Sequence, residues 1–153
     1  MNFENYMHEA LLLAKKAAAQ GEVPVGCVIA DKSGKIIGSG FNTREADRLV
    51  TSHAEVTALE AACHALGDWR LDQCTAFVTL EPCPMCAGAF INARLNTLVY
   101  GAREELFGSC ASVINLFEER YPSRTAIFAG VLEAECAEVL RTFFKARRIE
   151  QNS

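Results

Sequence analysis

The sequence predicts a single α/β domain in which helices cover both faces of a central mixed sheet. A chain of 153 residues suits one domain with a substantial core. Stretches rich in β-branched residues alternate with stretches of helical periodicity, as in layered α/β folds. The first two expected strands are joined by a short turn, which indicates an antiparallel hairpin and hence a mixed sheet. Because no repeat, linker or low-complexity segment interrupts the chain, we expect one domain over residues 1–153.

In the N-terminal half we expect a helix over residues 3–20, two hairpin strands over 23–29 and 35–41, and a second helix over 53–66. The apolar positions at helical spacing end at Gln20-Gly21, where we expect the first helix to stop. The turn between the strands is Asp31–Gly34. Thr51 or Ser52 offers an N-cap to the second helix, and Glu55 stands three residues after Ser52, as in a capping box.

In the C-terminal half we expect a strand over residues 75–80, a helix from about residue 83 and a second strand over 97–100. An irregular connection over 101–124 then leads to a third strand over 125–128 and a last helix over 132–148. Pro82 leads into the first of these helices, and two glycines and a proline break up the long connection. Strands and helices therefore alternate through the whole chain, which favours an α/β layer fold.

Composition narrows the classes of function. The net charge is −4 with a pI near 5.4, which argues against a broad basic surface for non-specific nucleic-acid binding. Neither a membrane span nor the basic and apolar regions of a signal peptide are visible, so we expect a cytoplasmic protein without membrane contact. Seven cysteines in such a chain argue against a disulfide framework. Three lie in apolar stretches and are expected to be small core residues: Cys27, Cys63 and Cys136.

One histidine and two cysteines form a candidate zinc site. His53, Cys83 and Cys86 carry the donor atoms that Zn²⁺ prefers, and three protein ligands leave a position open for water, as in catalytic sites. Cys83 and Cys86 are three residues apart, so they would share one face in the first turn of a helix. The helix dipole and the unpaired backbone N–H groups of that turn favour thiolates.

Glu55 is the candidate general acid and base. It stands two residues after His53, within reach of a proton on a metal-bound water, whose pKa would be roughly 7. The alternative is a carboxylate that only caps its own helix. Glu81 is a second carboxylate near the site, but negative charge before a helix is favourable in itself, so we interpret Glu81 as structural. These residues together predict a hydrolytic zinc enzyme.

The pairing of His-x-Glu with Pro-Cys-x-x-Cys is the pattern of zinc nucleobase deaminases. The sequence closely resembles the bacterial tRNA-specific adenosine deaminases, a branch of the cytidine and deoxycytidylate deaminase superfamily, over nearly its whole length. The segments that carry the resemblance are 22–26 (EVPVG), 53–55 (HAE), 78–89 (VTLEPCPMCAGA), 99–103 (VYGAR) and 143–148 (FFKARR). The central segments are specific for the superfamily, and the last two favour the tRNA branch.

The resemblance implies a cytidine-deaminase-like three-layer αβα sandwich with about five strands. It implies one Zn²⁺ per chain held by His53, Cys83 and Cys86, proton transfer by Glu55, and no organic cofactor. The reaction would convert the wobble adenosine of a tRNA anticodon stem-loop to inosine and release ammonia, with a single-stranded loop lowering the cost of unstacking the base. Family members are homodimers whose RNA site spans both subunits.

The resemblance also implies a set of substrate-binding residues: Asn42, Val25, Ala54, Arg103, Phe144, Arg147 and Arg148. Asn42 matches the asparagine that hydrogen-bonds the base, although it could equally be a turn residue at a strand end. Val25 could be ordinary core. Arg147 and Arg148 would contact phosphates or remain solvated charges. Adjacent aromatic residues point in different directions on a helix, so we expect Phe143 or Phe144 to pack into the core.

Two segments depart from the family pattern. Residues 49–52 (LVTS) replace a common Asp-Pro-Thr-Ala stretch, and Glu104 and Leu106, followed by Phe107, stand where an aspartate and a lysine are frequent. Loss of that lysine removes one potential phosphate contact. A deaminase of a free nucleobase, nucleoside or nucleotide, of guanine or cytosine type, therefore remains an alternative. A non-enzymatic zinc-stabilised binding module is a third, which the open ligand position and Glu55 disfavour.

Overall fold

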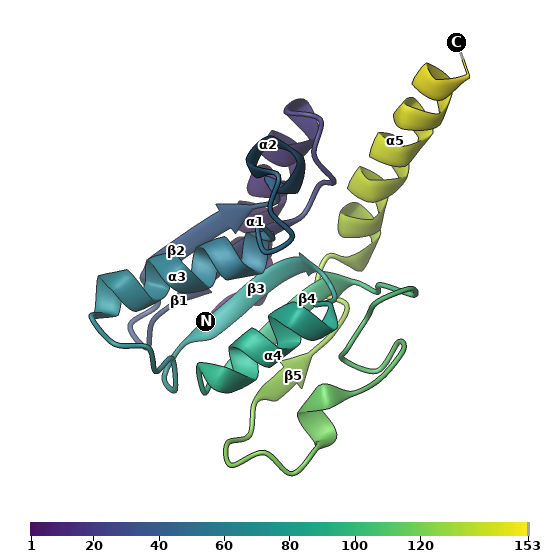
Figure 1. Ribbon diagram of the computed structural model, residues 1–153. Coiled ribbons are helices and arrows are strands. Elements are labelled where there is room, and N and C mark those ends of the chain that lie inside the picture. Colours follow the sequence, from purple (N-terminus) through teal and green to yellow (C-terminus); the bar gives the residue numbers. More distant parts are fainter. Residues whose placement is uncertain (153) are drawn as a thin grey trace.

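A computed structural model describes residues 1–152 as a five-stranded sheet between two layers of helices (Figure 1). The elements in chain order are α1 (Phe3–Ala19), β1 (Gly26–Ala30), β2 (Ile36–Phe41), α2 (Arg44–Asp47), α3 (Ala54–Leu66), β3 (Thr75–Leu80), α4 (Pro84–Asn92), β4 (Thr97–Ala102), the 3₁₀ helix η1 (Leu116–Glu118), β5 (Ala126–Phe128) and α5 (Glu133–Gln151).

The sheet is mixed, as the hairpin predicts. Its strand order is β2-β1-β3-β4-β5, with β1 antiparallel to both neighbours and the pairs β3–β4 and β4–β5 parallel. All five residues of β1 are buried, because this strand has a neighbour on each side and helices on both faces. Since β2 and β3 both run antiparallel to β1, their carboxyl ends lie at the same edge of the sheet.

Helices cover both faces, and the expected three-layer αβα sandwich is confirmed. On one face α1 and α5 pack over a cluster that includes Met7, Phe77 and Cys136. On the other face α3 and α4 pack over a cluster that includes Ala58 and Phe90. Figure 1 shows α3 and α4 side by side in front of the sheet, with α1 behind it.

Glycines in β2 let α3 lie unusually close to the sheet. A Cβ at Gly38 would stand 2.2 Å from the carbonyl oxygen of Ala58, and one at Gly40 would stand 2.6 Å from that of Ala54. Both distances are far below van der Waals contact, so a side chain at either position would push the helix away. This packing fixes the start of α3, and with it His53, against the edge of the sheet where β2 ends.

Two predictions about local structure are wrong. The first strand begins at Gly26 and not at residue 23, because Pro24 lacks a backbone donor and the Val25 amide turns back to the carbonyl of Val23 at 2.9 Å. The capping box is also absent: the N-cap of α3 is His53, and the Ser52 amide donates to the carbonyl of Leu49.

Other differences concern the extent of elements. The 4-residue α2 and the 3-residue η1 were not expected from the sequence. Strand β4 continues two residues further, to Ala102, because it pairs with β3 up to Leu80. Helix α5 runs on to Gln151.

The prediction that Phe143 or Phe144 packs into the core is wrong. Phe143 is only partly buried and Phe144 is 42% exposed. The reason is that α5 packs on the sheet through its first half, where Cys136 is buried, while its second half extends past the sheet (Figure 1). The two rings instead pack edge to face at 5.3 Å, with the Arg147 guanidinium 5.4 Å from the ring centre of Phe143.

The cysteines are all free thiols, as expected for a chain without a disulfide framework. Cys27 and Cys136 are buried, which confirms their interpretation as core residues, whereas Cys63 is only partly buried. Within residues 1–152, no helix is both long enough and apolar enough to cross a membrane.

Candidate active site

The site forms where two helices start at the same edge of the sheet. Helix α3 follows β2 after a connection that contains α2, and α4 follows β3 after the short link 81–83. His53 is the N-cap of α3 and Cys83 is the N-cap of α4, with Pro84 in the first helical position and Cys86 one turn in. Because the carboxyl ends of β2 and β3 lie at the same edge, residues thirty positions apart meet in space.

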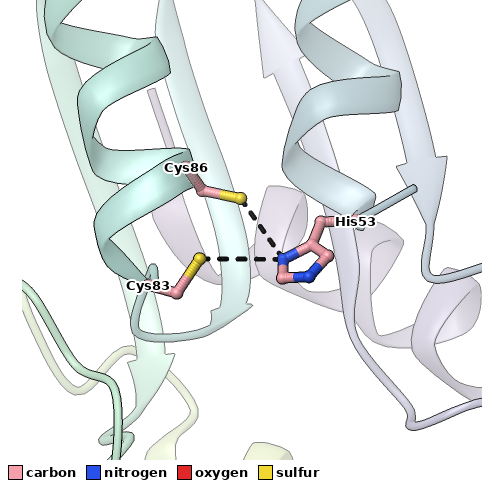
Figure 2. A group of neighbouring side chains, drawn as sticks. All are labelled: His53, Cys83 and Cys86. Atoms are coloured by element: carbon pink, nitrogen blue, oxygen red, sulfur yellow. Dashed lines mark hydrogen bonds between the residues drawn. The ribbon is translucent and has the colours of Figure 1, made fainter. Parts of the chain in front are cut away.

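The three predicted metal ligands come together with the geometry of a zinc site. His53 Nδ1 lies 3.7 Å from Cys83 Sγ and 3.5 Å from Cys86 Sγ, and Figure 2 shows this ring nitrogen pointing at both sulfurs. All three donor atoms lie within 4.8 Å of one another. Tetrahedral zinc, with bonds of about 2.3 Å to sulfur and about 2.0 Å to nitrogen, places a nitrogen and a sulfur ligand about 3.5 Å apart. The residues present therefore fit a zinc ion.

The pKa values of the two cysteines shift in opposite directions. The pKa of Cys83 is lowered to about 4, chiefly because Cys86 donates a hydrogen bond to its sulfur, with a second donated by His53. The same hydrogen bond, together with burial, raises the pKa of Cys86 well above its ordinary value. The hydrogen bond to Cys83 also raises the pKa of His53. Cys83 is thus a ready thiolate, and a cation bound among these groups would favour deprotonation of Cys86 as well.

Glu55 is buried beside the triad. Its side chain is 5% exposed, and burial raises the pKa of its carboxyl to about 6. A carboxyl with a pKa near neutrality can both accept and return a proton, which is what a general acid and base requires. The capping box with Ser52 is absent because His53 is the N-cap. The carboxylate of Glu55 does accept a hydrogen bond from its own backbone amide at the start of α3, which lowers its pKa and partly offsets the effect of burial.

Asn42 lines a cavity of about 400 Å³ formed by the segment before β1, the connection from β2 through α2, and α5. It is 8% exposed, and its amide both donates to the carbonyl of Val23 at 3.3 Å and accepts from the Arg44 amide at 3.1 Å. These bonds tie the start of α2 to the segment that precedes β1. The cavity is lined by Glu22, Val23, Asn42, Arg44, Glu45, Phe144, Arg147, Arg148 and Gln151.

The structure divides the predicted substrate-binding residues into two groups. Asn42, Phe144, Arg147 and Arg148 line the same cavity, although about a hundred residues of sequence separate the first from the others. The remaining three do not line it. Val25 and Ala54 are buried, at 9% and 0% exposure, and Arg103 is exposed just beyond the end of β4.

Sequence reasoning missed the role of Glu22 and the short helix α2. Glu22 is 1% exposed, and its two carboxylate oxygens accept from the amides of Glu45 and Ala46 at 3.0 and 2.9 Å. Thr43, a residue type that favours helix N-caps, was the available signal for α2. The sequence carried no signal for the remote carboxylate.

The interpretation of Glu81 as a structural residue agrees with its surroundings. It is 2% exposed, and its carboxylate accepts hydrogen bonds from the backbone of Glu104, Cys110 and Ser112.

Comparison with known proteins places the chain among deaminases. Residues 1–102 match the family model of the cytidine and deoxycytidylate deaminase zinc-binding region. The tRNA-specific adenosine deaminase of Bacillus subtilis (strain 168) is 44% identical over 146 residues, which cover 95% of this chain and 90% of that protein.

Solved structures agree. A structure from a study of A-to-I editing by tRNA:A34 deaminases at the wobble position of transfer RNA superimposes with a TM-score of 0.85 at 36% identity, covering 89% of this chain and 99% of that one. A guanine deaminase from Nitrosomonas europaea superimposes with a TM-score of 0.80 at 27% identity, covering 92% of this chain and 83% of that one. The relatives thus include both kinds of substrate that the sequence left open.

Proposed function

This chain belongs to the zinc-binding family of cytidine and deoxycytidylate deaminases, and we propose that it converts the wobble adenosine of a tRNA anticodon to inosine. The observation that carries the proposal is a His–Cys–Cys triad beside a buried glutamate, in a chain 44% identical over 95% of its length to a tRNA-specific adenosine deaminase. The overall reaction is hydrolytic: water adds to C6 of adenine, the bond from C6 to the amino nitrogen breaks, and ammonia leaves.

His53, Cys83 and Cys86 would hold the zinc, one ion per chain. Zinc bound by three protein ligands supplies a water activated for nucleophilic attack at neutral pH. His53 and Cys83 are the N-cap residues of α3 and α4, so the start of a helix places each of these two ligands. Cys86 is fully buried, which limits access of solvent to the sulfur.

Glu55 would move the protons. Its carboxylate accepts a proton from the attacking water, returns one to a ring nitrogen of the base, and assists departure of the amino group as ammonia. Burial supports this role because it raises the pKa of Glu55 to about 6, so that both protonation states are accessible near neutral pH. Glu55 is not one of the three grouped ligands, although its carboxylate accepts a hydrogen bond from Cys86, so a change at Glu55 should leave the ligand set complete.

The cavity beside Asn42 would receive the anticodon loop. The Asn42 side chain is held from two sides by backbone groups, so it can present its amide to a base without rearrangement. Phe144 offers an exposed ring on which a base can stack, a contact worth about 1–3 kcal/mol per base. Arg147 and Arg148 lie in the same wall and can bind phosphates, which concentrates positive charge locally on a protein whose net charge is −4.

The remaining assignments are also proposals: a single deaminase domain over the whole chain, a homodimer, and a cytoplasmic location. Exposed apolar side chains on the connection after β4 support association with a second copy, because large apolar patches on a monomer commonly mark interfaces. Leu106 is 78% exposed and Phe107 is 62% exposed. Sedimentation at several protein concentrations, with zinc determined on the same samples, would test the dimer and the stoichiometry.

Deamination of a free base is the second candidate. The resemblance in fold to a guanine deaminase at 27% identity favours it, as does Leu106 in place of a lysine that is frequent in the tRNA branch. A pocket for a free base needs no phosphate contacts. The two candidate functions therefore differ in whether the α5 residues that line the cavity are needed for turnover.

A panel of substrates separates the two candidates. Zinc-loaded protein is incubated with an anticodon stem-loop that bears adenosine at the wobble position and, separately, with free adenosine, guanine and cytidine, and ammonia is measured in each. We expect ammonia from the stem-loop alone. Release from guanine or cytidine with an unreactive stem-loop would replace the proposed function with nucleobase metabolism.

A further inference from the structure

We infer that Glu81 is a positioning residue for the reaction: its buried carboxylate holds the loop 103–112 in place beside the metal-binding triad. The inference rests on the proposed function, since it concerns the same site. Glu81 is one of the few carboxylates fully inside the protein, and neither the metal ligands nor the proton chemistry uses it.

Within residues 1–152, the hydrogen bonds to this carboxylate come from one loop. Oε2 accepts from the Cys110 amide at 2.9 Å and the Ser112 amide at 3.1 Å, and Oε1 accepts from the Glu104 amide at 3.2 Å and from the Ser112 hydroxyl. The donors lie 23 to 31 residues further along the chain. One side chain therefore ties the beginning of the loop to its end.

The loop also fits closely against the link that leads to the metal ligands. A Cβ at Gly108 would stand 2.5 Å from the Glu81 carboxylate, so the backbone there approaches as near as a glycine permits. The Ser109 amide donates to the carbonyl of Pro82 at 2.9 Å, and the Glu81 amide donates to that of Ala102 at 2.8 Å. Cys83 follows Pro82 directly, so the loop and the metal ligand share the same support.

The charge of Glu81 is balanced by these dipoles. Glu81 takes no part in the ion pairs Arg70–Asp68 and Arg141–Glu138. Burial by itself raises the pKa of Glu81, but the hydrogen bonds from Ser112, Cys110 and Glu104 outweigh it, so that the pKa is lowered and the group is charged at neutral pH. A charged carboxylate accepts stronger hydrogen bonds than a neutral amide would.

The tied loop carries residues that face solvent next to the site. Arg103 begins it, and Leu106 and Phe107, the residues proposed above to associate with a second copy, stand exposed between the two tied ends in the single chain. Glu81 itself is covered, so it acts on substrate only through the placement of this loop. Loss of the clamp is thus expected to weaken substrate binding while zinc and the proton chemistry of Glu55 remain.

The test compares Glu81→Gln with the pair Ser112→Ala and Ser112→Thr, which differ in the hydroxyl donated to Glu81. Asp31→Asn is the matched control, because Asp31 also accepts three hydrogen bonds from one turn, at the opposite end of the sheet. Zinc content, amide hydrogen exchange over 103–112, and KM and kcat are measured for each, on whichever substrate of the panel the wild-type protein deaminates.

We expect Glu81→Gln to keep its zinc, to exchange faster over 103–112, and to raise KM about tenfold with kcat changed less than about threefold. Ser112→Ala should also exchange faster over 103–112 and raise KM, but by less than Glu81→Gln. Ser112→Thr and Asp31→Asn should match the wild type in both measurements. If Glu81→Gln does not fold, the Ser112 pair decides alone.

Unchanged exchange over 103–112, or faster exchange with an unchanged KM, would overturn the inference. A merely structural role would lower thermal stability without moving KM at a temperature where the variant is folded. A wild-type protein that does not deaminate the stem-loop would refute the proposed function separately, while the exchange measurement and KM on the actual substrate would still decide the role of Glu81.

Discussion

The metal-binding triad is held in a different way from two other segments, α2 and the loop 103–112, which we expect to contact the substrate and call the walls. The triad rests on local structure: His53 and Cys83 are N-caps, and Cys86 follows Cys83 by one turn of helix. The walls rest on two buried carboxylates that reach across the chain, Glu22 to the start of α2 and Glu81 to the loop after β4. Local helix geometry therefore positions the metal ligands, whereas long-range hydrogen bonds position the segments that we expect to contact the substrate.

The two carboxylates make similar contacts, each with backbone amides of a segment more than twenty residues further along the chain. Glu22 accepts two consecutive amides of α2, a helix whose own N-cap, Thr43, makes no side-chain capping bond. Glu81 accepts three amides and a hydroxyl of the loop. Changes to the triad should accordingly abolish chemistry, whereas changes to the walls should alter binding.

Loss of a metal ligand should have the largest effect. Cys83→Ala removes one of three ligands, so we expect zinc to be lost and turnover to fall below detection. Metal analysis of the purified variant checks this. Cys63→Ala, which removes a partly buried thiol on α3 outside the triad, should keep both zinc and activity. Full zinc occupancy in Cys83→Ala would refute the ligand assignment.

Loss of the proton carrier should separate chemistry from metal binding. Glu55→Gln removes the basic oxygen while preserving size, and kcat should fall by about 10²–10⁴-fold with zinc retained. Glu60→Gln, on an exposed position of the same helix, is the control and should behave as the wild type. Wild-type kcat in a zinc-loaded Glu55→Gln variant would rule out the proposed role.

Loss of the Glu22 clamp should affect binding and leave the chemistry in place. Glu22→Gln places an amide opposite two backbone N–H groups, so α2 should loosen and KM for the stem-loop should rise about tenfold, with kcat changed less than about threefold. Steady-state kinetics measure both constants. The control is Glu9→Gln, which changes an exposed carboxylate on α1 and should behave as the wild type. An equal loss of kcat and kcat/KM would mean that this wall takes part in the chemistry itself.

Loss of one charge on α5 should have the smallest effect. Arg148→Ala removes one phosphate contact, so the slope of log affinity against log salt should become shallower by about 0.7 for a single-stranded loop. Binding titrations at several salt concentrations measure the slope, with Lys32→Ala in the distant hairpin turn as the control. An unchanged slope would leave Arg148 as a solvated charge.

The same contrast explains what could be predicted from the sequence. His53, Cys83 and Cys86 were found because ligand types at short spacing on helix starts leave a local pattern. Glu55 was predicted for the same reason, whereas the capping box with Ser52 is absent because His53, with an extended backbone, takes the N-cap position.

The walls were harder to predict because their signals are not local. Helix α2 has only four residues and depends on a carboxylate more than twenty positions earlier. The exposure of Phe143 and Phe144 follows from where α5 leaves the sheet, which helical periodicity does not encode. The fold was predictable because alternation of strands and helices is visible along the chain, whereas pairings such as Glu81 with Ser112 arise only after folding.

The most direct measurement is the position of inosine in a stem-loop after incubation with the zinc-loaded protein. The substrate carries adenosine at the wobble position and at other positions of the loop, and the product is sequenced. Inosine at the wobble position alone, absent with Glu55→Gln, is the result that we predict. Inosine spread over all loop adenosines, or an unmodified stem-loop beside rapid release of ammonia from a free base, would contradict a wobble-specific tRNA deaminase.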